Sequence, residues 1–236
     1  VPMATQRGVL VVNSPEGNTI AAAEHALTLL LSLSRHVPQA HASTMAGGWD
    51  RKKYVGNELY KKVLGVVGLG KIGSHVAKVA KAMGMDVMAY DPFISADRAQ
   101  QMQVRLSTLE GLFEQADYIT LHLPRTPDTE NLVNAELLAT MKPTARIVNC
   151  ARGGIVDEPA LAEALKSGVI GGAALDVYAK EPLAADSPLR SVQERLILTP
   201  HLGASTEEAQ ENVATDVAEQ IRDVLLGLPA RSAVNI

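Results

Sequence analysis

The sequence predicts an α/β fold whose centre is a doubly wound parallel sheet, and three observations support this. From residue 63 onward, short apolar runs of strand type alternate with helical segments, as in βαβ units. Apolar residues make up 47% of the 236 residues but aromatic residues only 3%, so small aliphatic side chains must fill the core, which is typical of buried parallel strands. A glycine-rich turn separates the first of these strands from the helix that follows it.

The expected strands are short runs rich in Val, Ile, Leu and Ala, at 64–67, 87–90, 118–121, 147–149, 172–175 and 196–198, with a weaker one near 104–106. Helices are expected between most of them, for example at 73–83 and 159–166. A long final helix, about 206–227, leads to a short extended tail at 232–236.

The part of the chain before residue 63 predicts one more strand and a helical arm. The strand is Val9–Val12, which ends at the turn signal Asn13-Ser-Pro. Thr19 is suited to cap the Ala- and Leu-rich helix that follows, and a second helical stretch runs from Pro38 to about Gly47. The apolar residues 21–33 of this arm predict either a dimer interface or burial in the core of one subunit.

Composition and charge exclude several classes of function. The net charge is −4, and the densest basic run is Arg51-Lys52-Lys53, so we expect no nucleic-acid partner. The longest apolar stretch, around 26–33, is too short and too polar to span a membrane. Cys150 is the single cysteine and has no internal disulfide partner, which favours a reducing cytosol. We identify no metal site.

The glycine-rich turn reads Gly68-Leu-Gly70-Lys-Ile-Gly73, and its context makes it a dinucleotide-binding (Rossmann) fingerprint. Gly68 permits the tight turn, Gly70 lets a diphosphate approach the backbone, and Gly73 lets helix and strand pack closely. Asp91 ends the next strand, 18 residues after Gly73, and would bind the adenosine ribose hydroxyls and repel a 2′-phosphate. We therefore expect NAD rather than NADP. The plainer alternative is that Asp91 is a surface turn residue before Pro92.

Three later strands end in segments that each offer one group suited to oxidising an alcohol. His201 is a candidate proton acceptor, because histidine titrates near neutrality. Glu181 would hold the imidazole ring and favour its charged form, and Arg152 would bind a substrate carboxylate in a two-pronged contact. Taken singly, each has a plainer interpretation, as a structural histidine, a surface acid and a surface base. Their combination with the fingerprint favours a catalytic group of Arg152, Glu181 and His201.

Four segments together resemble the D-isomer-specific 2-hydroxyacid dehydrogenase family: the glycine-rich turn with Asp91, Asn149-Cys-Ala-Arg-Gly-Gly154, Asp176-Val-Tyr-Ala-Lys-Glu-Pro182 and Pro200-His-Leu-Gly-Ala-Ser-Thr206. The formate dehydrogenase branch of this family carries Gln where Glu181 stands. The resemblance implies NAD as cofactor, with a binding set made of Gly68, Gly70, Lys71, Ile72, Gly73, Asp91, Leu123, Pro124, Cys150, Ala151, Arg152, Asp176, His201 and Gly203. In this set Asp176 would approach the nicotinamide carboxamide.

The resemblance also implies a domain division in which both chain ends are short remnants of a second, substrate-binding domain. Residues 1–17 would be one remnant, 18–204 the NAD-binding Rossmann domain with its helical arm, 205–227 a helix returning to the substrate domain, and 228–236 its C-terminal tail. The first part of the family's pattern, which carries much of the substrate site, is missing. We therefore expect this chain to bind NAD but to turn over little or no substrate by itself.

Segments of the arm and the tail resemble one branch of the family, whose members oxidise a small phosphorylated hydroxy acid in the first step of serine biosynthesis. The resemblance implies a homodimer or homotetramer in the cytoplasm, or in the plastid stroma of a plant. Arg51, Lys52 and Lys53 would help to bind the substrate phosphate, or else form a solvated loop. Two alternatives stay open: a glyoxylate, hydroxypyruvate or lactate reductase, and an NADH-sensing binding protein similar to the C-terminal-binding corepressors.

Overall fold

The computed structural model describes residues 1–192 and 194–235, and the chain divides into two compact units. The larger unit consists of residues 23–202, and the smaller one combines residues 1–22 with the segment that begins at Gly203. Each unit is described below by itself. None of the helices in the described residues is long and apolar enough to cross a membrane.

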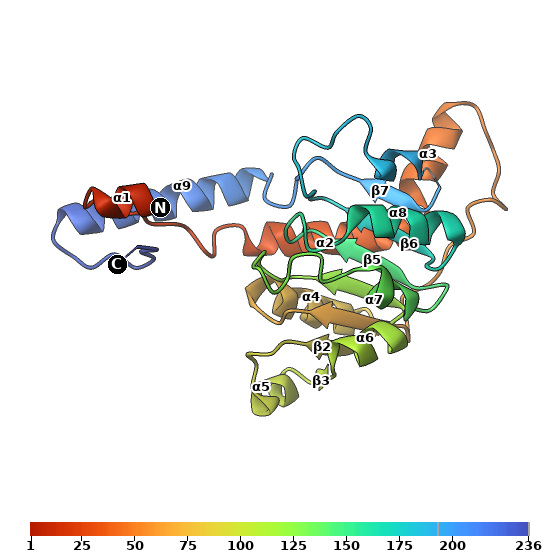
Figure 1. Ribbon diagram of the computed structural model, residues 1–236, viewed down its shortest axis with the longest axis horizontal. Helices are drawn as coiled ribbons and strands as arrows, with labels where there is room; N and C mark the ends of the chain where they lie inside the picture. Colours follow the sequence, from red (N-terminus) through yellow and green to blue (C-terminus); the bar gives the residue numbers. More distant parts are fainter. Residues whose placement is uncertain (193, 236) are drawn as a thin grey trace. The chain divides into compact units, whose positions relative to one another are not determined.

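In its described part, the larger unit contains one seven-stranded sheet in which all neighbouring strands are parallel (Figure 1). The strands are β1 (Val63–Val67), β2 (Asp86–Tyr90), β3 (Arg105–Leu106), β4 (Tyr118–Leu121), β5 (Arg146–Asn149), β6 (Gly172–Leu175) and β7 (Leu196–Leu198). Their order, β3-β2-β1-β4-β5-β6-β7, reverses direction between β1 and β4. The prediction of a doubly wound parallel sheet is confirmed, and each predicted strand from 64–67 onward is present.

Helices cover both faces of this sheet. The described helices between residues 19 and 202 are α2 (Thr19–Arg35), α3 (Val37–Met45), α4 (Lys71–Ala82), α5 (Ala96–Gln101), α6 (Leu109–Gln115), α7 (Ala135–Ala139), α8 (Glu158–Ser167) and the 3-10 helix η1 (Pro188–Ser191). Helix α3 has no buried residue and does not cover the sheet. Local sequence explains the ends of these helices: in α8, the Asp157 side chain accepts a hydrogen bond from Ala160 N, Pro159 lies in the first turn, and Gly168 closes the helix at φ +76°.

Successive strand residues point to opposite faces of the sheet and so feed two separate cores. On β1, Val67 belongs to one hydrophobic cluster with Leu112, Phe113 and Leu161 of α6 and α8. Its neighbour Val66 belongs to the other cluster, which is covered by α2 and α4. Because both faces are covered, the strands are apolar throughout, which explains why they stand out in the sequence.

Helix α2 is a core element of this fold. Its apolar side chains pack on the sheet, and Ala23, Ala26, Leu30 and Leu33 are at most 3% exposed. Of the two interpretations of residues 21–33, burial within one subunit is confirmed for most of the apolar stripe, while Leu31 is 40% exposed and the dimer interface stays a prediction. Thr19 was expected to be the capping residue just before this helix, but it is the first residue of the helix itself.

The smaller unit contains α1 (Pro2–Gln6) and the long helix α9 (Glu207–Leu225), which Thr206 caps by accepting a hydrogen bond from Ala209 N. The predicted strand Val9–Val12 is wrong: only Val12 pairs, in an isolated antiparallel bridge with Ala233. The buried Gln220 side chain donates to Asn13 O and accepts from Ser232 N, so side-chain bonds add to the two backbone bonds, Asn13 N to Ser232 O and Val234 N to Val11 O, that join the chain ends. Of the predicted tail, Ile236 lies outside the described residues.

Candidate active site

The predicted site residues of the larger unit follow strands that end at one edge of the sheet. In the register, Val67 of β1 faces Leu121 of β4, and Leu121 faces Asn149 of β5. The series continues through Leu175 of β6 to Leu198 of β7. The loops after these strands therefore start side by side, at the carboxyl edge where open α/β sheets bind ligands.

The glycines of the turn after β1 have different surroundings. Gly68 has φ +96°, and a Cβ there would lie 2.7 Å from His122 O. A Cβ on Gly73 would lie 1.9 Å from Gly68 O, so this residue lets the start of α4 pack against the turn. A Cβ on Gly70 would meet nothing within 4 Å. Gly68 and Gly73 thus shape the turn, and Gly70 leaves open space at the N-terminus of α4.

Asp91 is fixed to this turn by two hydrogen bonds. Its Oδ2 atom accepts from Leu69 N at 2.7 Å, and its Oδ1 atom accepts from Phe93 N at 2.9 Å. The carboxylate therefore stands beside the glycine-rich turn, and each oxygen retains lone pairs for a further donor. Backbone N–H groups at a helix N-terminus attract a diphosphate, and a neighbouring carboxylate accepts from ribose hydroxyls. The residues present fit a dinucleotide.

The remaining cofactor residues expected from the resemblance are distributed as follows. Lys71 and Ile72 open α4, Leu123 and Pro124 follow β4, and Cys150 and Ala151 follow β5. Burial, reinforced by the charge of Asp176, raises the pKa of the Cys150 thiol, so this cysteine is an inert thiol at the sheet edge. Gly203 belongs to the smaller unit.

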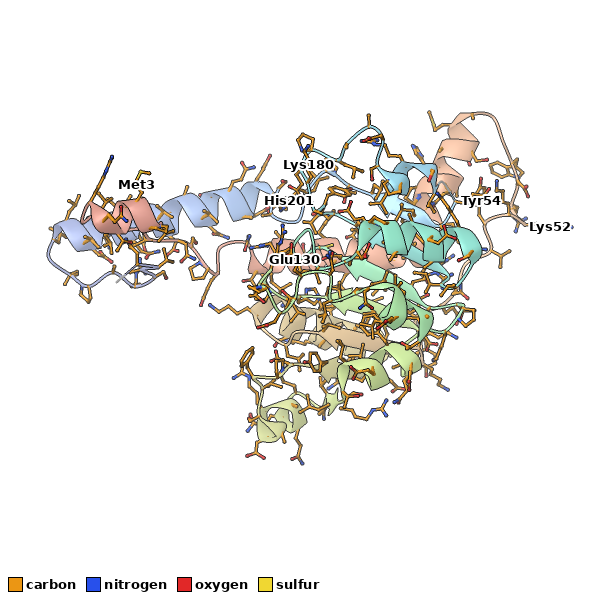
Figure 2. The ribbon with its side chains drawn as sticks, viewed as in Figure 1. Met3, Lys52, Tyr54, Glu130, Lys180 and His201 are labelled. Atoms are coloured by element: carbon orange, nitrogen blue, oxygen red, sulfur yellow. The ribbon has the colours of Figure 1, made fainter. Side chains whose placement is uncertain are left out.

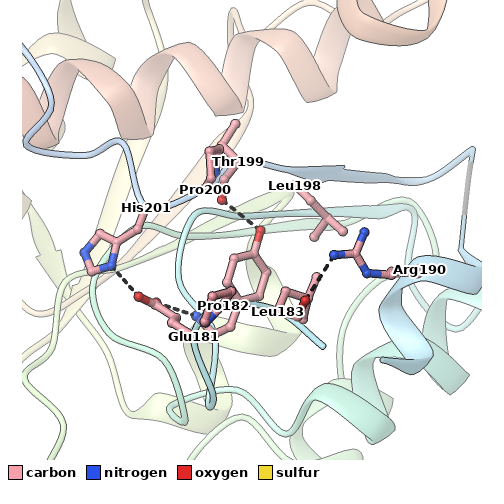
Figure 3. A pocket seen from close by; sticks show the side chains of 9 residues that line it. Glu181, Pro182, Leu183, Arg190, Leu198, Thr199, Pro200 and His201 are labelled. Carbon is pink, nitrogen blue, oxygen red and sulfur yellow. Dashed lines mark hydrogen bonds and ion pairs between the residues drawn. The ribbon is translucent and has the colours of Figure 1, made fainter. Parts of the chain in front are cut away.

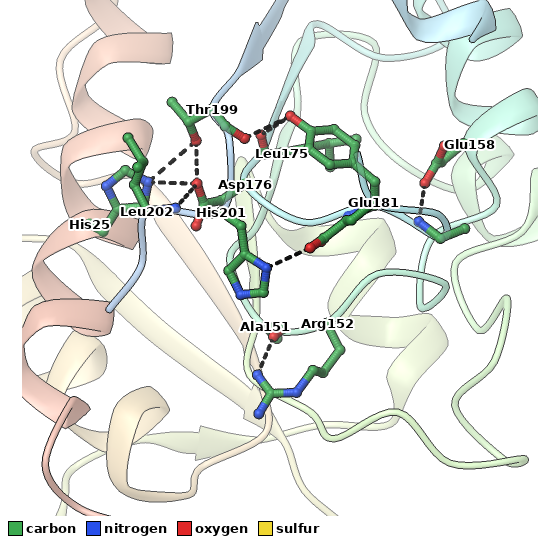
Figure 4. A network of polar contacts seen from close by, with 12 residues as sticks. His25, Ala151, Arg152, Glu158, Leu175, Asp176, Glu181, Thr199, His201 and Leu202 are labelled. Carbon is green, nitrogen blue, oxygen red and sulfur yellow. Dashed lines mark hydrogen bonds and ion pairs between the residues drawn. The ribbon is translucent and has the colours of Figure 1, made fainter. Parts of the chain in front are cut away.

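His201 and Glu181 form a hydrogen-bonded pair on neighbouring loops (Figure 4). The imidazole Nδ1 lies 2.8 Å from Glu181 Oε2, and Glu181 Oε1 accepts from Tyr178 N at 3.1 Å. This contact with His201 is the main cause that lowers the pKa of Glu181. The His201 side chain is 51% exposed, so the ring is held by one nitrogen while much of it faces open space. A histidine held in this way can exchange a proton with a bound molecule.

Arg152 emerges from the loop after β5, at the same sheet edge as Glu181 and His201 (Figure 4). The buried Asn149 side chain shapes this loop, because it donates to Arg152 O and accepts from Ala151 N. The exposed guanidinium donates to Ala151 O at 2.6 Å through Nη1. Its remaining donors are available to a carboxylate.

Asp176 lies in the loop after β6, beside the backbone that carries His201, and its expected contact with the carboxamide stays a prediction. Its side chain is fully buried, and Oδ1 accepts from Thr199 Oγ1 at 2.5 Å and from Leu202 N at 2.8 Å. His25 Nε2, on α2, lies 3.1 Å from the same oxygen. In this arrangement the carboxylate holds the segment on both sides of His201.

A pocket of about 630 Å³ adjoins the His201–Glu181 pair (Figure 3). Its walls come from three short segments, with lining residues Tyr178, Glu181, Pro182, Leu183, Arg190, Leu198, Thr199, Pro200 and His201. The Tyr178 hydroxyl donates to Thr199 O at 2.8 Å, and burial is the main cause that raises its pKa to about 12. Arg190 donates to Leu183 O and Ala184 O, which fixes the outer wall.

The basic run Arg51-Lys52-Lys53 does not reach this site within one chain. Lys52 and Tyr54 lie at the far end of the larger unit from His201 (Figure 2). Lys53 forms an ion pair with Glu194, at 3.1 Å. The structure thus joins Arg152, Glu181, His201 and the glycine-rich turn at one edge. It adds His25, Tyr178 and Asn149, which the sequence did not single out.

The comparisons with known proteins agree with this geometry. Residues 27–203 match the family model "D-isomer specific 2-hydroxyacid dehydrogenase, NAD binding domain". A D-3-phosphoglycerate dehydrogenase of Synechocystis sp. is 67% identical over all of this chain, which spans 42% of that protein. The corresponding enzyme of Bacillus subtilis is 50% identical over 99% of this chain, which spans 44% of it. The chain therefore spans less than half the length of these relatives.

Solved structures share the fold over nearly the whole chain. The TT0316 protein from Thermus thermophilus superposes with a TM-score of 0.89 at 36% identity, over 99% of this chain and 74% of that one. D-lactate dehydrogenase from Aquifex aeolicus, complexed with NAD and lactic acid, has a TM-score of 0.89 at 26% identity, over 100% of this chain and 76% of that one.

Proposed function

Because the chain belongs to the D-isomer specific 2-hydroxyacid dehydrogenase family, through its NAD binding domain, we propose that it serves the NAD-dependent oxidation of 3-phosphoglycerate to 3-phosphohydroxypyruvate, the first step of serine biosynthesis. The observation that carries this proposal is the His201–Glu181 hydrogen bond beside Arg152, at the sheet edge that also carries the glycine-rich turn. The names of the relatives at 50–67% identity support the choice of substrate.

The bound nicotinamide would accept a hydride from the carbon that carries the hydroxyl group. In the same reaction His201 takes the hydroxyl proton, the C–H bond breaks with its electron pair, and a C=O bond forms. Nδ1 faces Glu181, so Nε2 is the nitrogen that receives the proton. Glu181 keeps the ring oriented and stabilises the imidazolium that results.

Arg152 is assigned to the substrate carboxylate. Its planar guanidinium matches a carboxylate, and the loop that carries it is fixed by Asn149. Asp91 is assigned to the ribose hydroxyls of NAD, since its charge at the turn opposes a 2′-phosphate. Gly68, Gly70 and Gly73, with the start of α4, are assigned to the diphosphate.

The compartment and the oligomeric state are further parts of the proposal. A free thiol at Cys150, the single cysteine, suits the reducing cytoplasm or the stroma of a plastid. A homodimer or homotetramer is supported by large apolar side chains exposed in and after α3, since Met45, Trp49 and Val55 are each at least 74% exposed. Sedimentation analysis tests this assignment, and a monomer at micromolar concentration would refute it.

The test of the function is a substrate panel on the protein that carries this chain. NADH formation is measured with 3-phosphoglycerate, D-lactate and glycerate, using NAD and NADP in parallel. We expect 3-phosphoglycerate with NAD to give the highest kcat/KM. A clear preference for an unphosphorylated acid would overturn the substrate assignment and leave the family unaffected.

Two variants test the assigned roles. His201→Asn should lower kcat on the order of 10²–10⁴-fold, because the proton acceptor is lost. Glu181→Gln should lower it less, because an amide still holds the ring. His41→Asn, on the exposed face of α3, is the matched control and should leave kcat unchanged. NAD binding should survive in all three variants, and an active His201→Asn protein would contradict the assignment.

A further inference from the structure

A second pocket lies at the opposite edge of the sheet from His201. Its volume is about 540 Å³, and its lining residues are His36, Gln39, Lys53, Tyr54, Asn57, Pro143, Thr144, Arg146, Gly171, Glu194 and Arg195. Arg146 opens β5, Gly171 immediately precedes β6, and Arg195 immediately precedes β7. The pocket is therefore built at the amino ends of three strands, and roughly one strand length, about 13 Å, separates this edge from the carboxyl edge.

The charges in this pocket do not cancel. Glu194 is the one acid that lines it, and Lys53 neutralises this acid in an ion pair of 3.1 Å. Arg146 Nη1 donates to Thr144 O, and its guanidinium carbon lies 5.6 Å from the centroid of the Tyr118 ring. Within the described part of the chain, Arg195 has no acceptor for its guanidinium. Two positive charges thus remain uncompensated around one cavity.

Two further side chains of this pocket, Gln39 and His36, bear on the chemistry of a ligand that would fit it. Gln39 Oε1 is buried without a hydrogen-bond partner, counting only the residues that the structure describes. Rotating this amide by half a turn would present its N–H donors instead. Burial and the nearby charge of Arg146 lower the pKa of His36. A bound anion would offset the charge of Arg146 and supply acceptors to these donors.

We propose that this pocket binds a small dianion, such as a phosphate monoester or a dicarboxylate, at a site separate from the proposed active site. The two charges of such a ligand match Arg146 and Arg195. A guanidinium forms paired hydrogen bonds with phosphate or carboxylate oxygens, and these charge-assisted bonds are the stronger class. The cavity admits a molecule of that size, and Lys53 with Glu194 forms its rim.

The experiment is a calorimetric titration of this chain with inorganic phosphate at fixed ionic strength, in the presence of saturating NAD. The cofactor blocks the helix N-terminus of α4, which is the other place where phosphate would bind. We expect one phosphate per chain. Arg195→Gln should weaken its affinity by about tenfold or more, because one charge-assisted contact is lost. Arg98→Gln, an exposed arginine on α5, is the matched control and should have no effect.

Two results would overturn the proposal: phosphate heats that match those of chloride, or an affinity that Arg195→Gln leaves unchanged. Arg146→Gln is the second variant, and its thermal unfolding is recorded first because Arg146 also contacts Tyr118. Malonate in place of phosphate separates the two ligand classes. Tighter malonate binding would assign the site to dicarboxylates, and tighter phosphate binding to phosphate monoesters.

Discussion

His25 Nε2 lies 3.1 Å from Asp176 Oδ1, and this contact joins helix α2 to the loop that follows β6. The same carboxylate oxygen accepts from Thr199 Oγ1 and Leu202 N, on either side of His201. His25 Nε2 also lies 3.3 Å from Thr199 Oγ1. A buried carboxylate with these contacts fixes the backbone from which His201 projects, so the position of the imidazole depends on residues that it does not touch.

Replacing Asp176 tests this dependence. Asp176→Ala should lower the free energy of unfolding by roughly 2–4 kcal/mol, because it leaves buried donors unpaired. It should also lower kcat with little change in KM for the substrate, since His201 loses its support. Urea unfolding and steady-state kinetics measure the two effects. Asp186→Ala, at an exposed acid later in the same loop, is the control. Unchanged stability in Asp176→Ala would show that the buried network contributes nothing.

The glycine-rich turn offers a matched pair of variants. Gly73→Ala would place a Cβ 1.9 Å from Gly68 O, so it should destabilise the fold and abolish NAD binding. At Gly70 a Cβ meets nothing within 4 Å, and φ is −64°, which alanine adopts readily. Gly70→Ala should therefore keep the melting temperature and lose about tenfold or more in NAD affinity, because the methyl group occupies the space assigned to the diphosphate. Wild-type NAD affinity in Gly70→Ala would refute this assignment.

Asp91 is predicted to select the cofactor. Asp91→Ala should weaken NAD binding by about tenfold and reduce the preference for NAD over NADP, since both a hydrogen-bond acceptor and a repelling charge are removed. Fluorescence titrations with both cofactors measure the change. Asp86→Ala, at the exposed start of the same strand, is the control. If Asp91→Ala keeps the full preference for NAD, another residue must exclude the 2′-phosphate.

The fold of the larger unit was predictable because both faces of its sheet are covered. Strands such as Tyr118–Leu121 are buried at every position, so an uninterrupted apolar run marks each of them. In the smaller unit the apolar run Val9–Val12 gave a misleading signal. Val9 and Leu10 are 53% and 40% exposed, and the backbone pairing there is one isolated bridge, supplemented by side-chain contacts of Gln220 and Asn235. An apolar run therefore predicts a strand falsely where no sheet is present to pair with it.

The site was predictable only where its residues lie at strand ends. Glu181 and His201 follow neighbouring parallel strands, so their meeting follows from topology. His25 comes from a helix far away in the sequence, and only the packing of α2 on the sheet brings it to Asp176. The burial of Asp176 could not be predicted either, because the residues that pack over it are distant from it in the sequence.

His122, next to the glycine-rich turn, predicts a dependence of stability on pH. The residue as a whole is half-buried, and burial of its ring lowers its pKa to about 4. In the unfolded chain a histidine titrates near 6.5. Below that pH the unfolded state binds a proton that the folded state does not, so stability is lost as the pH falls from about 6.5 towards 4.

The expected loss is on the order of 2 kcal/mol between about pH 6.5 and pH 5. His122→Asn should remove this part of the dependence, because asparagine does not titrate. It should also cost some stability at every pH, because the contact between His122 Nε2 and Thr120 Oγ1, at 3.0 Å, is lost. Urea unfolding across the pH range separates the two effects, with His41→Asn as the exposed control. Parallel pH curves for the wild type and His122→Asn would mean that His122 has the same pKa in the folded and unfolded states, and would contradict this prediction.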